Sequence, residues 1–180
     1  GTGYPLRLTV DAPVIFRGTA ISEMTISLSE GWNMFSGLSS SLSAENIYAQ
    51  EIIQSGTIYG LDGNYISPES IDPGKGYWVR ASEDGEITLT SETSEKQVTF
   101  NNRTEEANSI TFSNENYSTD LYFGIDVAED QWLSYSLPPT LPQMAFDVRF
   151  SGDMKLVPNF GEIEIINHSE MLTVSYEIKV

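Results

Sequence analysis

Apolar and polar positions alternate along most of this sequence, and the alternation predicts β-strands. Side chains of a strand point in turn to its two faces, so a period of two gives one apolar face. The longest alternation extends from Leu172 to Val180, and another extends from Leu121 to Val127. Shorter alternating segments predict further strands at residues 4–10, 21–28, 32–35, 57–60, 77–81, 86–90, 98–100 and 110–112.

One segment has the signals of a short helix instead. Ser43 is a suitable N-cap, because its hydroxyl can accept a hydrogen bond from a free N–H group of the first turn. Residues 44–54 follow with an apolar face that includes Ile47 and Ile52. Gly56 is a suitable stop, since glycine adopts the left-handed conformation that ends many helices.

These elements divide the chain into three parts. Residues 1–27 are interpreted as strands that continue a preceding repeat unit. Residues 28–93 contain the helix and several strands, and they predict a small α+β module. Residues 94–180 carry strand-like segments at intervals of roughly 8–12 residues, which is typical of an antiparallel β-sandwich. The sequence therefore predicts a mainly β fold, with a boundary in the polar segment 91–95.

A short phrase recurs along the chain and indicates a modular array. Residues 1–7 read G-T-G-Y-P-L-R, and residues 74–80 read G-K-G-Y-W-V-R. Residues 146–150 repeat the alternation more weakly. Such repeats are typical of stacked or serial units. In both phrases we expect the tyrosine (Tyr4 or Tyr77) to point into a core and the residue after it to point outward.

Composition narrows the function classes. The formal net charge is −17, from 26 acidic and 9 basic residues, so nucleic acid and anionic membrane surfaces would repel the chain. No apolar run approaches the roughly 20 residues that a membrane span needs. Cysteine is absent, which excludes disulfides, thiolate metal sites and a cysteine nucleophile.

The outward position after Tyr77 predicts a binding surface. Trp78 and Arg80 share that face, and we expect the loop residues Tyr59 and Tyr65 to support them. Aromatic rings with neighbouring polar groups can stack on sugar rings, so these residues are candidates for carbohydrate binding. The alternative, which the sequence favours, is that Trp78 covers the seam between domains or the short helix that follows the serine-rich stretch.

The remaining aromatic side chains predict core positions. Trp32 begins a strand with Met34 on the same side, and we expect both in a core. Trp132 and Tyr135 are expected on opposite faces of one strand, which would bury one and expose the other.

The high acidic content raises the question of a calcium site with oxygen ligands. Asp62, Asn64 and Asp72 are candidates, with Glu69 near them in the sequence. Their spacing does not match a calcium-binding loop, so the sequence favours solvated turn residues. Calcium binding stays open as the alternative, and no other cofactor is predicted.

Few residues of the sequence are candidates for a catalytic role. His168 is the one histidine, and it lies in a segment that predicts a surface turn. Glu162 and Glu164 share a strand face, as do the two carboxylates of some β-sandwich glycosidases. A third acid is missing after them, and Ile163 and Ile165 are expected to pack inward. We therefore predict that the chain is not an enzyme and keep such a glycosidase only as an alternative.

Three phrases resemble modules of large secreted and surface proteins of Bacteroidota and related bacteria. Residues 28–36 (LSEGWNMFS) resemble the opening of one such module, and residues 71–79 (IDPGKGYWV) resemble its close. Residues 137–139 (LPP) with residues 146–150 (FDVRF) resemble a β-domain that often precedes a type IX secretion sorting domain. The resemblance implies an extracellular, modular and non-catalytic architecture.

The sequence therefore predicts a non-catalytic structural and interaction segment of a modular bacterial protein, secreted or on the cell surface. Its expected partners are neighbouring modules of the same polypeptide. The alternative is a carbohydrate-binding module that is accessory to a secreted glycoside hydrolase, with a polysaccharide as its partner.

Overall fold

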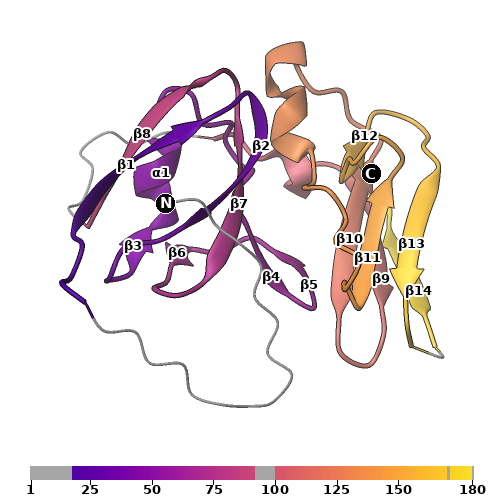
Figure 1. Ribbon diagram of the computed structural model, residues 1–180. Helices are drawn as coiled ribbons and strands as arrows, with labels where there is room; N and C mark the ends of the chain where they lie inside the picture. The colour runs from indigo at the N-terminus through magenta and orange to yellow at the C-terminus, as the bar shows by residue number, and fades with distance from the viewer. Residues whose placement is uncertain (1–17, 92–99, 170, 180) are drawn as a thin grey trace. The chain divides into compact units, whose positions relative to one another are not determined.

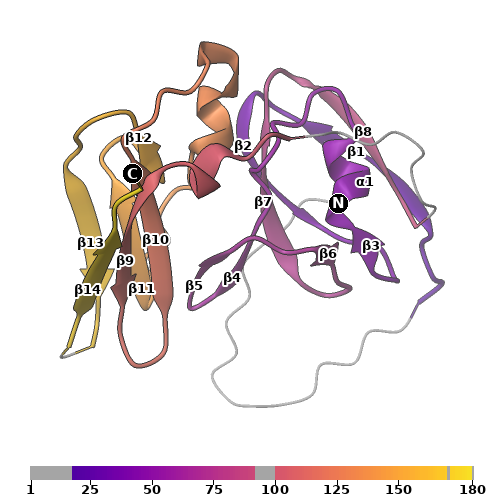
Figure 2. The same ribbon diagram turned by 180° about the vertical axis from the view of Figure 1, so that it is seen from behind.

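The computed structural model describes residues 18–91, 100–169 and 171–179, and these residues are mainly in β-strands (Figures 1 and 2). Several antiparallel strand pairs and one short α-helix confirm the predicted fold class. The chain divides into two compact units: the first takes the described residues of 1–54 and 68–98, and the second those of 55–67 and 99–180. The predicted strand and repeat phrase within residues 1–10 lie outside the described residues, as does most of segment 91–95.

The first unit is built from antiparallel strand pairs and the helix. Strand β1 (Glu23–Leu28) pairs with β8 (Gly85–Thr90), and β2 (Gly31–Ser36) pairs with β7 (Gly76–Ala81). The short strands β3 (Leu42–Ser43) and β6 (Ser70–Ile71) form a further pair. Helix α1 (Ala44–Tyr48) follows β3 and contacts β8.

Helix α1 is shorter than predicted, although its cap is the predicted one. The hydroxyl of Ser43 accepts a hydrogen bond from the N–H group of Glu45 at 3.2 Å. The helix ends at Tyr48 because the following residues bond to strand β7 and the turn after it. Ile53 forms a β-bridge with Ala81. Residues 52–54 are therefore paired with a strand, and they cannot continue the helix.

The predicted alternation of residues 77–81, with Tyr77 toward the core and Trp78 on the other face, is confirmed. Tyr77, Val79 and Ala81 are all buried, and Tyr77 is only 4% exposed. Phe35 on β2 lies opposite Tyr77 and is also buried, with the two ring centroids 6.0 Å apart. This face of the β2–β7 pair is therefore the core face, and Trp78 and Arg80 lie on the other.

Asn33 closes the tight connection between β1 and β2. Its side-chain oxygen accepts a hydrogen bond from the N–H group of Ser29 at 3.0 Å, and its amide donates to the carbonyls of Ser29 and Gly31 at 2.7 and 3.0 Å. Gly31 has φ = 90°, a conformation that favours glycine. The Gly-Trp-Asn phrase thus has a structural role in its first and third residues.

Tyr77 closes a second turn, in the phrase that precedes β7. Its hydroxyl accepts a hydrogen bond from the N–H group of Asp72 at 2.9 Å. Gly74 within this turn has φ = 76°. The phrase from Asp72 to Tyr77 therefore folds back on the buried tyrosine, and this geometry explains why it contains glycine and an inward tyrosine.

The second unit contains two facing sheets and a hairpin. One sheet has the order β12–β10–β9–β14, and the other pairs β11 with β13. These strands are β9 (Asn108–Ser113), β10 (Ser118–Phe123), β11 (Phe146–Phe150), β12 (Leu156–Val157), β13 (Ile163–Asn167) and β14 (Thr173–Glu177). The pairs are antiparallel except β10 with β12, which is parallel.

The hairpin of β4 (Tyr59–Asp62) and β5 (Asn64–Ile66) belongs to the second unit, although the predicted α+β module included it. Its contacts explain the assignment. The Asn64 amide donates to the carbonyl of Ser118 at 3.1 Å, and the Ala145 N–H group donates to the carbonyl of Gly63 at 3.2 Å. Whether residues 28–93 and 94–180 fold as separate domains stays a prediction.

The segment around Trp132 is helical, and the predicted strand there is wrong. Residues Glu129–Tyr135 form the 3-10 helix η2, and a shorter one, η1, covers Arg103–Glu105. Tyr135 is fully buried, while Trp132 is half-buried and packs against the same core. Both side chains point toward one core because the helical period, unlike a strand, can bring residues three apart to one face.

A buried ion pair fixes strand β11, whose residues are all buried. The guanidinium group of Arg149 donates to both carboxylate oxygens of Asp147, to the carbonyl of Pro138 at 2.7 Å and to the carboxylate of Asp153 at 2.7 Å. The charged group thus has partners on β11, on the loop before it and on the turn after it. The two phrases that resemble a known β-domain are therefore joined by one side chain.

Candidate functional site

The face of the β2–β7 pair opposite the core carries two tryptophans and an arginine. Trp32 lies directly opposite Arg80, and Met34 lies directly opposite Trp78 in the strand register. Directly opposite residues of an antiparallel pair project to the same face. We call Trp32, Trp78 and Arg80 the Trp surface.

The three side chains of the Trp surface contact one another. The ring centroids of Trp32 and Trp78 are 6.5 Å apart with an interplanar angle of 87°, which is an edge-to-face arrangement. The guanidinium carbon of Arg80 lies 5.8 Å from the Trp32 ring centroid, within the range of a cation–π interaction. All three are half-buried. The Trp surface is thus an ordered cluster, since each member restricts another.

The prediction that Trp32 and Met34 lie in the core is wrong. Phe35 is the buried residue of β2, and Trp32 and Met34 are half-buried. The sequence of this short strand could not show which face is buried, because Trp32 and Phe35 are both aromatic and lie on opposite faces. The signal that could have placed Trp32 is the pairing register, which puts it opposite Arg80.

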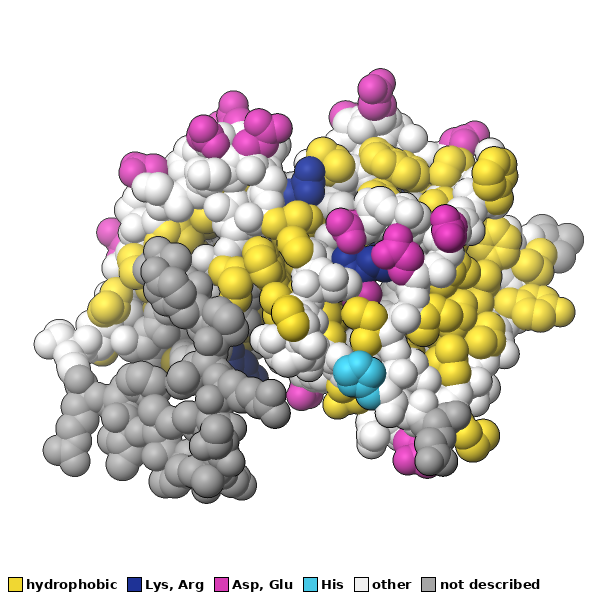
Figure 3. Space-filling view, turned by 45° about the vertical axis from the view of Figure 1, so that its right-hand side comes forward, with side chains coloured by type: hydrophobic (Ala, Val, Ile, Leu, Met, Phe, Trp, Pro, Cys, Tyr) yellow, Lys and Arg dark blue, Asp and Glu magenta, His cyan; other side chains and the backbone are white. Residues whose placement is uncertain are grey.

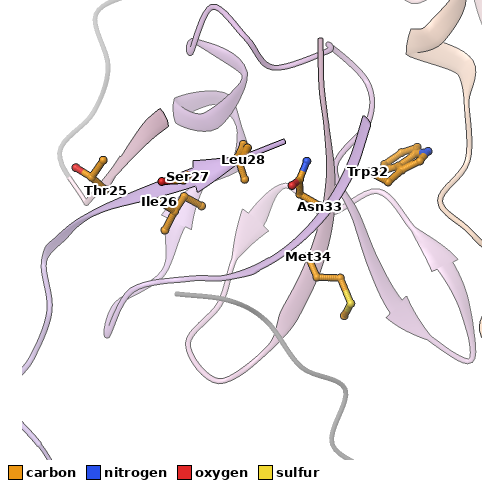
Figure 4. A pocket seen from close by; sticks show the side chains of 7 residues that line it. All are labelled: Thr25, Ile26, Ser27, Leu28, Trp32, Asn33 and Met34. Atoms are coloured by element: carbon orange, nitrogen blue, oxygen red, sulfur yellow. The ribbon is translucent and has the colours of Figure 1, made fainter. Parts of the chain in front are cut away.

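A pocket of about 510 Å³ adjoins the Trp surface at Trp32 (Figure 4). It is lined by Thr25, Ile26, Ser27 and Leu28 of β1 and by Trp32, Asn33 and Met34 of β2. None of these side chains is charged. The Ser27 hydroxyl donates to Glu86 at 3.2 Å, and the Asn33 amide is used in the turn before β2. Its polar side chains therefore already serve the local fold.

The four residues predicted to bind carbohydrate do not all belong to one unit. Trp78 and Arg80 lie together on the first unit, but Tyr59 and Tyr65 belong to the second. Tyr59 is buried, and its hydroxyl donates to the carbonyl of Ser136 at 3.3 Å. The Tyr65 hydroxyl donates to the carbonyl of Pro139 at 2.6 Å. Both tyrosines thus have structural hydrogen bonds within their own unit.

Tyr59 also contacts a lysine whose ammonium group is largely removed from water. Lys155 Nζ donates to the Tyr59 hydroxyl at 2.9 Å and lies 5.3 Å from the Tyr59 ring centroid. Burial lowers the pKa of Lys155 to about 8, and burial raises the pKa of Tyr59 above its usual range. Both shifts disfavour the charged forms, as expected for groups with little access to water.

The candidate metal ligands are not gathered into a site. The Asp72 carboxylate accepts hydrogen bonds from Lys75 at 3.0 Å and Ser41 at 2.9 Å, and these bonds hold the pKa of Asp72 below its usual value. The Asn64 amide donates to the Ser118 carbonyl within the second unit, and Asp62 is exposed in the same hairpin. Within residues 18–91, 100–169 and 171–179, no group of three potential acidic, histidine or cysteine ligands is close enough to hold an ion.

The candidate catalytic residues lie on the surface of the second unit. Glu162 and Glu164 are exposed, as is His168. Ile163 packs against the core as predicted, but Ile165 is exposed, so its predicted inward packing is wrong. Whether the chain has catalytic activity stays a prediction.

The chain matches no protein-family model, no curated protein and no solved structure. The resemblance of its phrases to secreted modules therefore stays a prediction. In the part of the chain that the structure describes, no helix combines the length and hydropathy needed to cross a membrane.

Proposed function

We propose that this chain is a non-catalytic structural and interaction segment of a modular extracellular protein of bacteria. The observation that supports this most directly is the Trp surface. It lies on the strand face opposite the buried Tyr77, and its side chains are only half-buried there. Tryptophan and arginine are also the side chains most enriched among the residues that dominate protein interfaces.

The geometry of the Trp surface favours a protein partner over an extended glycan. Arg80 lies over one face of the Trp32 ring, and the edge of one tryptophan meets the face of the other. Two rings at 87° do not form one flat platform for consecutive sugar units. An edge-to-face pair with an adjacent guanidinium suits an irregular surface that carries both apolar and acceptor groups. Neighbouring modules of the same polypeptide are the proposed partners.

The proposed extracellular location is based on the three sequence phrases that resemble modules of secreted and surface proteins. The Gly-Trp-Asn turn, the Asp72–Tyr77 turn and the buried Arg149 give these phrases structural roles. Such phrases are what a reusable module would retain, because they define its fold rather than a reaction. The type IX route and the bacterial surface are part of this proposal.

A thermodynamic cycle tests the proposed contact. The free energy of unfolding of the first unit is measured for wild type and Trp78→Ala, in this chain alone and within the full-length protein. The substitution should cost about 2 kcal/mol more in the full-length protein, as expected for a central interface residue. Ile21→Ala, which removes an exposed apolar side chain of the first unit outside the pocket lining, is the control and should cost the same in both. Equal losses for Trp78→Ala in both settings would refute the proposal.

A carbohydrate-binding module is the second candidate, favoured by the half-exposed ring of Trp78. One sugar ring could stack on it, with Arg80 as a hydrogen-bond donor. Retention on insoluble polysaccharides is compared for wild type, Trp78→Ala and Tyr176→Ala, the latter removing an exposed aromatic ring of the second unit. Loss with Trp78→Ala alone supports this candidate. No retention of wild type, or loss with Tyr176→Ala alone, rejects Trp78 as a sugar site.

A further inference from the structure

Among the described residues, none covers the core face of the four-stranded sheet in the second unit at its β14 end. Leu121, Ile110 and Tyr176 lie directly opposite one another on β10, β9 and β14. Directly opposite residues share a face, so these three belong to one row. Leu121 is 0% exposed, Ile110 is half-buried, and Tyr176 is 77% exposed. Burial therefore decreases along the row toward β14.

A neighbouring row shows the same decrease. Phe112 on β9 is buried in the core, and its direct partner on β14, Val174, is 54% exposed. The other face of these strands is polar, with Thr111 of β9 opposite Ser175 of β14. Strand β14 thus has the alternation of a strand with one buried face. Its apolar face nevertheless lies open.

In the facing sheet of β11 and β13, the exposure of the core-face side chains also increases toward the outer strand, β13. Val148 of β11 is 1% exposed, whereas its direct partner on β13, Ile165, is 45% exposed. Strands β13 and β14 follow each other in the chain and lie at the same side of the second unit in both ribbon views (Figures 1 and 2). Figure 3 shows hydrophobic side chains gathered on this side. We call Ile165, Val174 and Tyr176 the open edge.

The backbone of the open edge can accept a further strand. In the described part of the chain, β14 pairs only with β9, and β13 pairs only with β11. An outer strand has a row of N–H and C=O groups that no neighbouring strand satisfies. Natural edge strands are often protected by lysine, proline or a bulge. Strand β14 itself has none of the first two, and Lys179 beyond it forms an ion pair with Glu177 at 2.6 Å.

We propose that the open edge binds an extended segment of another polypeptide, which adds to β14 as a strand. The segment would place alternate apolar side chains against Val174, Tyr176 and Ile165. It would carry lysine or arginine beside this apolar core. Main-chain hydrogen bonds would supply affinity and the apolar positions would supply specificity, as in other cases of strand addition. This inference is independent of the Trp surface and adds a second interaction site.

Charge decides between a basic partner and a second copy of this chain. The exposed carboxylates of Glu162 and Glu164 lie on or next to β13, whereas the carboxylate of Glu177 on β14 is paired with Lys179. The whole chain has a formal charge of −17, so two copies would repel each other on approach. A segment with lysine or arginine flanks would instead be attracted, and its association would weaken as salt increases.

Synthetic peptides test this inference on the complete chain. One peptide alternates valine or isoleucine with threonine over about nine residues, a common strand length, and has lysines at both ends. A second has the same core with glutamates at both ends. A third keeps the composition of the first but has scrambled alternation. Binding is measured by fluorescence anisotropy at low and high salt, and the site is mapped by backbone amide chemical shifts.

Two double variants locate the site. Val174→Thr with Tyr176→Thr removes the apolar side chains of the open edge and keeps a residue type that favours strands. Leu61→Thr with Ile66→Thr is the matched control, because these apolar side chains are also exposed on strands of the second unit. Circular dichroism and urea unfolding confirm that both variants fold.

We expect the lysine-flanked peptide to bind wild type and the control variant, and to bind the open-edge variant at least about tenfold more weakly, a difference of about 1.4 kcal/mol. Shifted amides should lie in β14 and β13. Absence of binding at about 1 mM, which corresponds to only about 4 kcal/mol, would overturn the inference. Equal binding of the glutamate-flanked or scrambled peptide would also overturn it. Concentration-dependent self-association lost in the open-edge variant would show a second copy as the occupant instead.

Discussion

Arg149 and Asp147 form a doubly hydrogen-bonded ion pair inside the second unit. Nε of Arg149 donates to Oδ2 of Asp147 at 2.6 Å, and Nη2 donates to Oδ1 at 2.8 Å. Both side chains are buried. The remaining guanidinium nitrogen, Nη1, donates to the carbonyl of Pro138 and to the carboxylate of Asp153. A buried charge with its partners complete is tolerated, but the loss of Asp147 would remove its buried ionic partner and leave only the exposed carboxylate of Asp153.

Replacement of Asp147 should therefore strongly destabilise the second unit. For Asp147→Asn we expect a loss of about 3–5 kcal/mol in the free energy of unfolding, because Arg149 stays charged and buried. Asp153→Asn is the control, since the Asp153 side chain is 58% exposed and its loss should cost about 1 kcal/mol or less. Urea unfolding followed by the indole NMR signal of Trp132, which is distinct from those of Trp32 and Trp78, measures both. Similar losses for the two variants would show that burial does not determine the strength of this network.

Asn33→Ala should destabilise the first unit by about 1–2 kcal/mol, because it removes three side-chain hydrogen bonds that close the turn before β2. Trp32 lies beside Asn33, and its indole NMR signal reports the unfolding of this unit. Asn116→Ala, at an exposed turn position, is the control and should change stability by less than about 0.5 kcal/mol. A loss no greater than that of the control would mean that solvent replaces the Asn33 bonds.

The lowered pKa of Lys155 predicts a rise of stability with pH. Below pH 8 the lysine is protonated in both states, so the folded state has the full cost of the buried charge. Between pH 8 and the ordinary value of 10.5 the folded state releases its proton first, and the cost disappears. We expect the unfolding free energy of the second unit to rise by about 2 kcal/mol from pH 8 to pH 10. Above this range Tyr59 opposes the trend, since its raised pKa disfavours ionisation in the folded state.

Lys155→Met separates this effect from the rest of the chain. The methionine keeps an apolar stem and cannot titrate, so the rise between pH 8 and pH 10 should be absent. A titration of wild type by NMR, with the lysine side chain observed directly, should give a pKa near 8 for Lys155. An unshifted pKa, or an unchanged rise in the variant, would assign the pH dependence to other groups.

The sequence predicted the parity of strand β7 because alternation over Tyr77, Val79 and Ala81 is a local property. It did not predict the position of Trp32, because the face on which a residue lies depends on the pairing of two strands. The Ser43 cap was predicted from its local hydrogen bond. The end of the helix was not, since Ile53 pairs with a strand nearly thirty residues later in the chain, at Ala81.

Long-range contacts also explain the other differences. The hairpin of residues 59–66 joins the second unit through bonds to Ser118 and Ala145, which no local pattern indicates. The alternation in β14 correctly predicted a strand. It could not show that Tyr176 would be exposed, because hydrophobic periodicity predicts a face but not what covers it.

The most direct test of the central claim is the solvent accessibility of adjacent residues on β7. Trp78 is expected on the outer face and Tyr77 in the core, where it is 4% exposed. A soluble nitroxide added to the isotopically labelled chain broadens the NMR signals of side chains that solvent can reach. The account predicts broadening of the Trp78 indole N–H signal and little change in the ring signals of Tyr77 and Phe35. A protected Trp78 indole with broadened Tyr77 signals would reverse the two faces and remove the Trp surface.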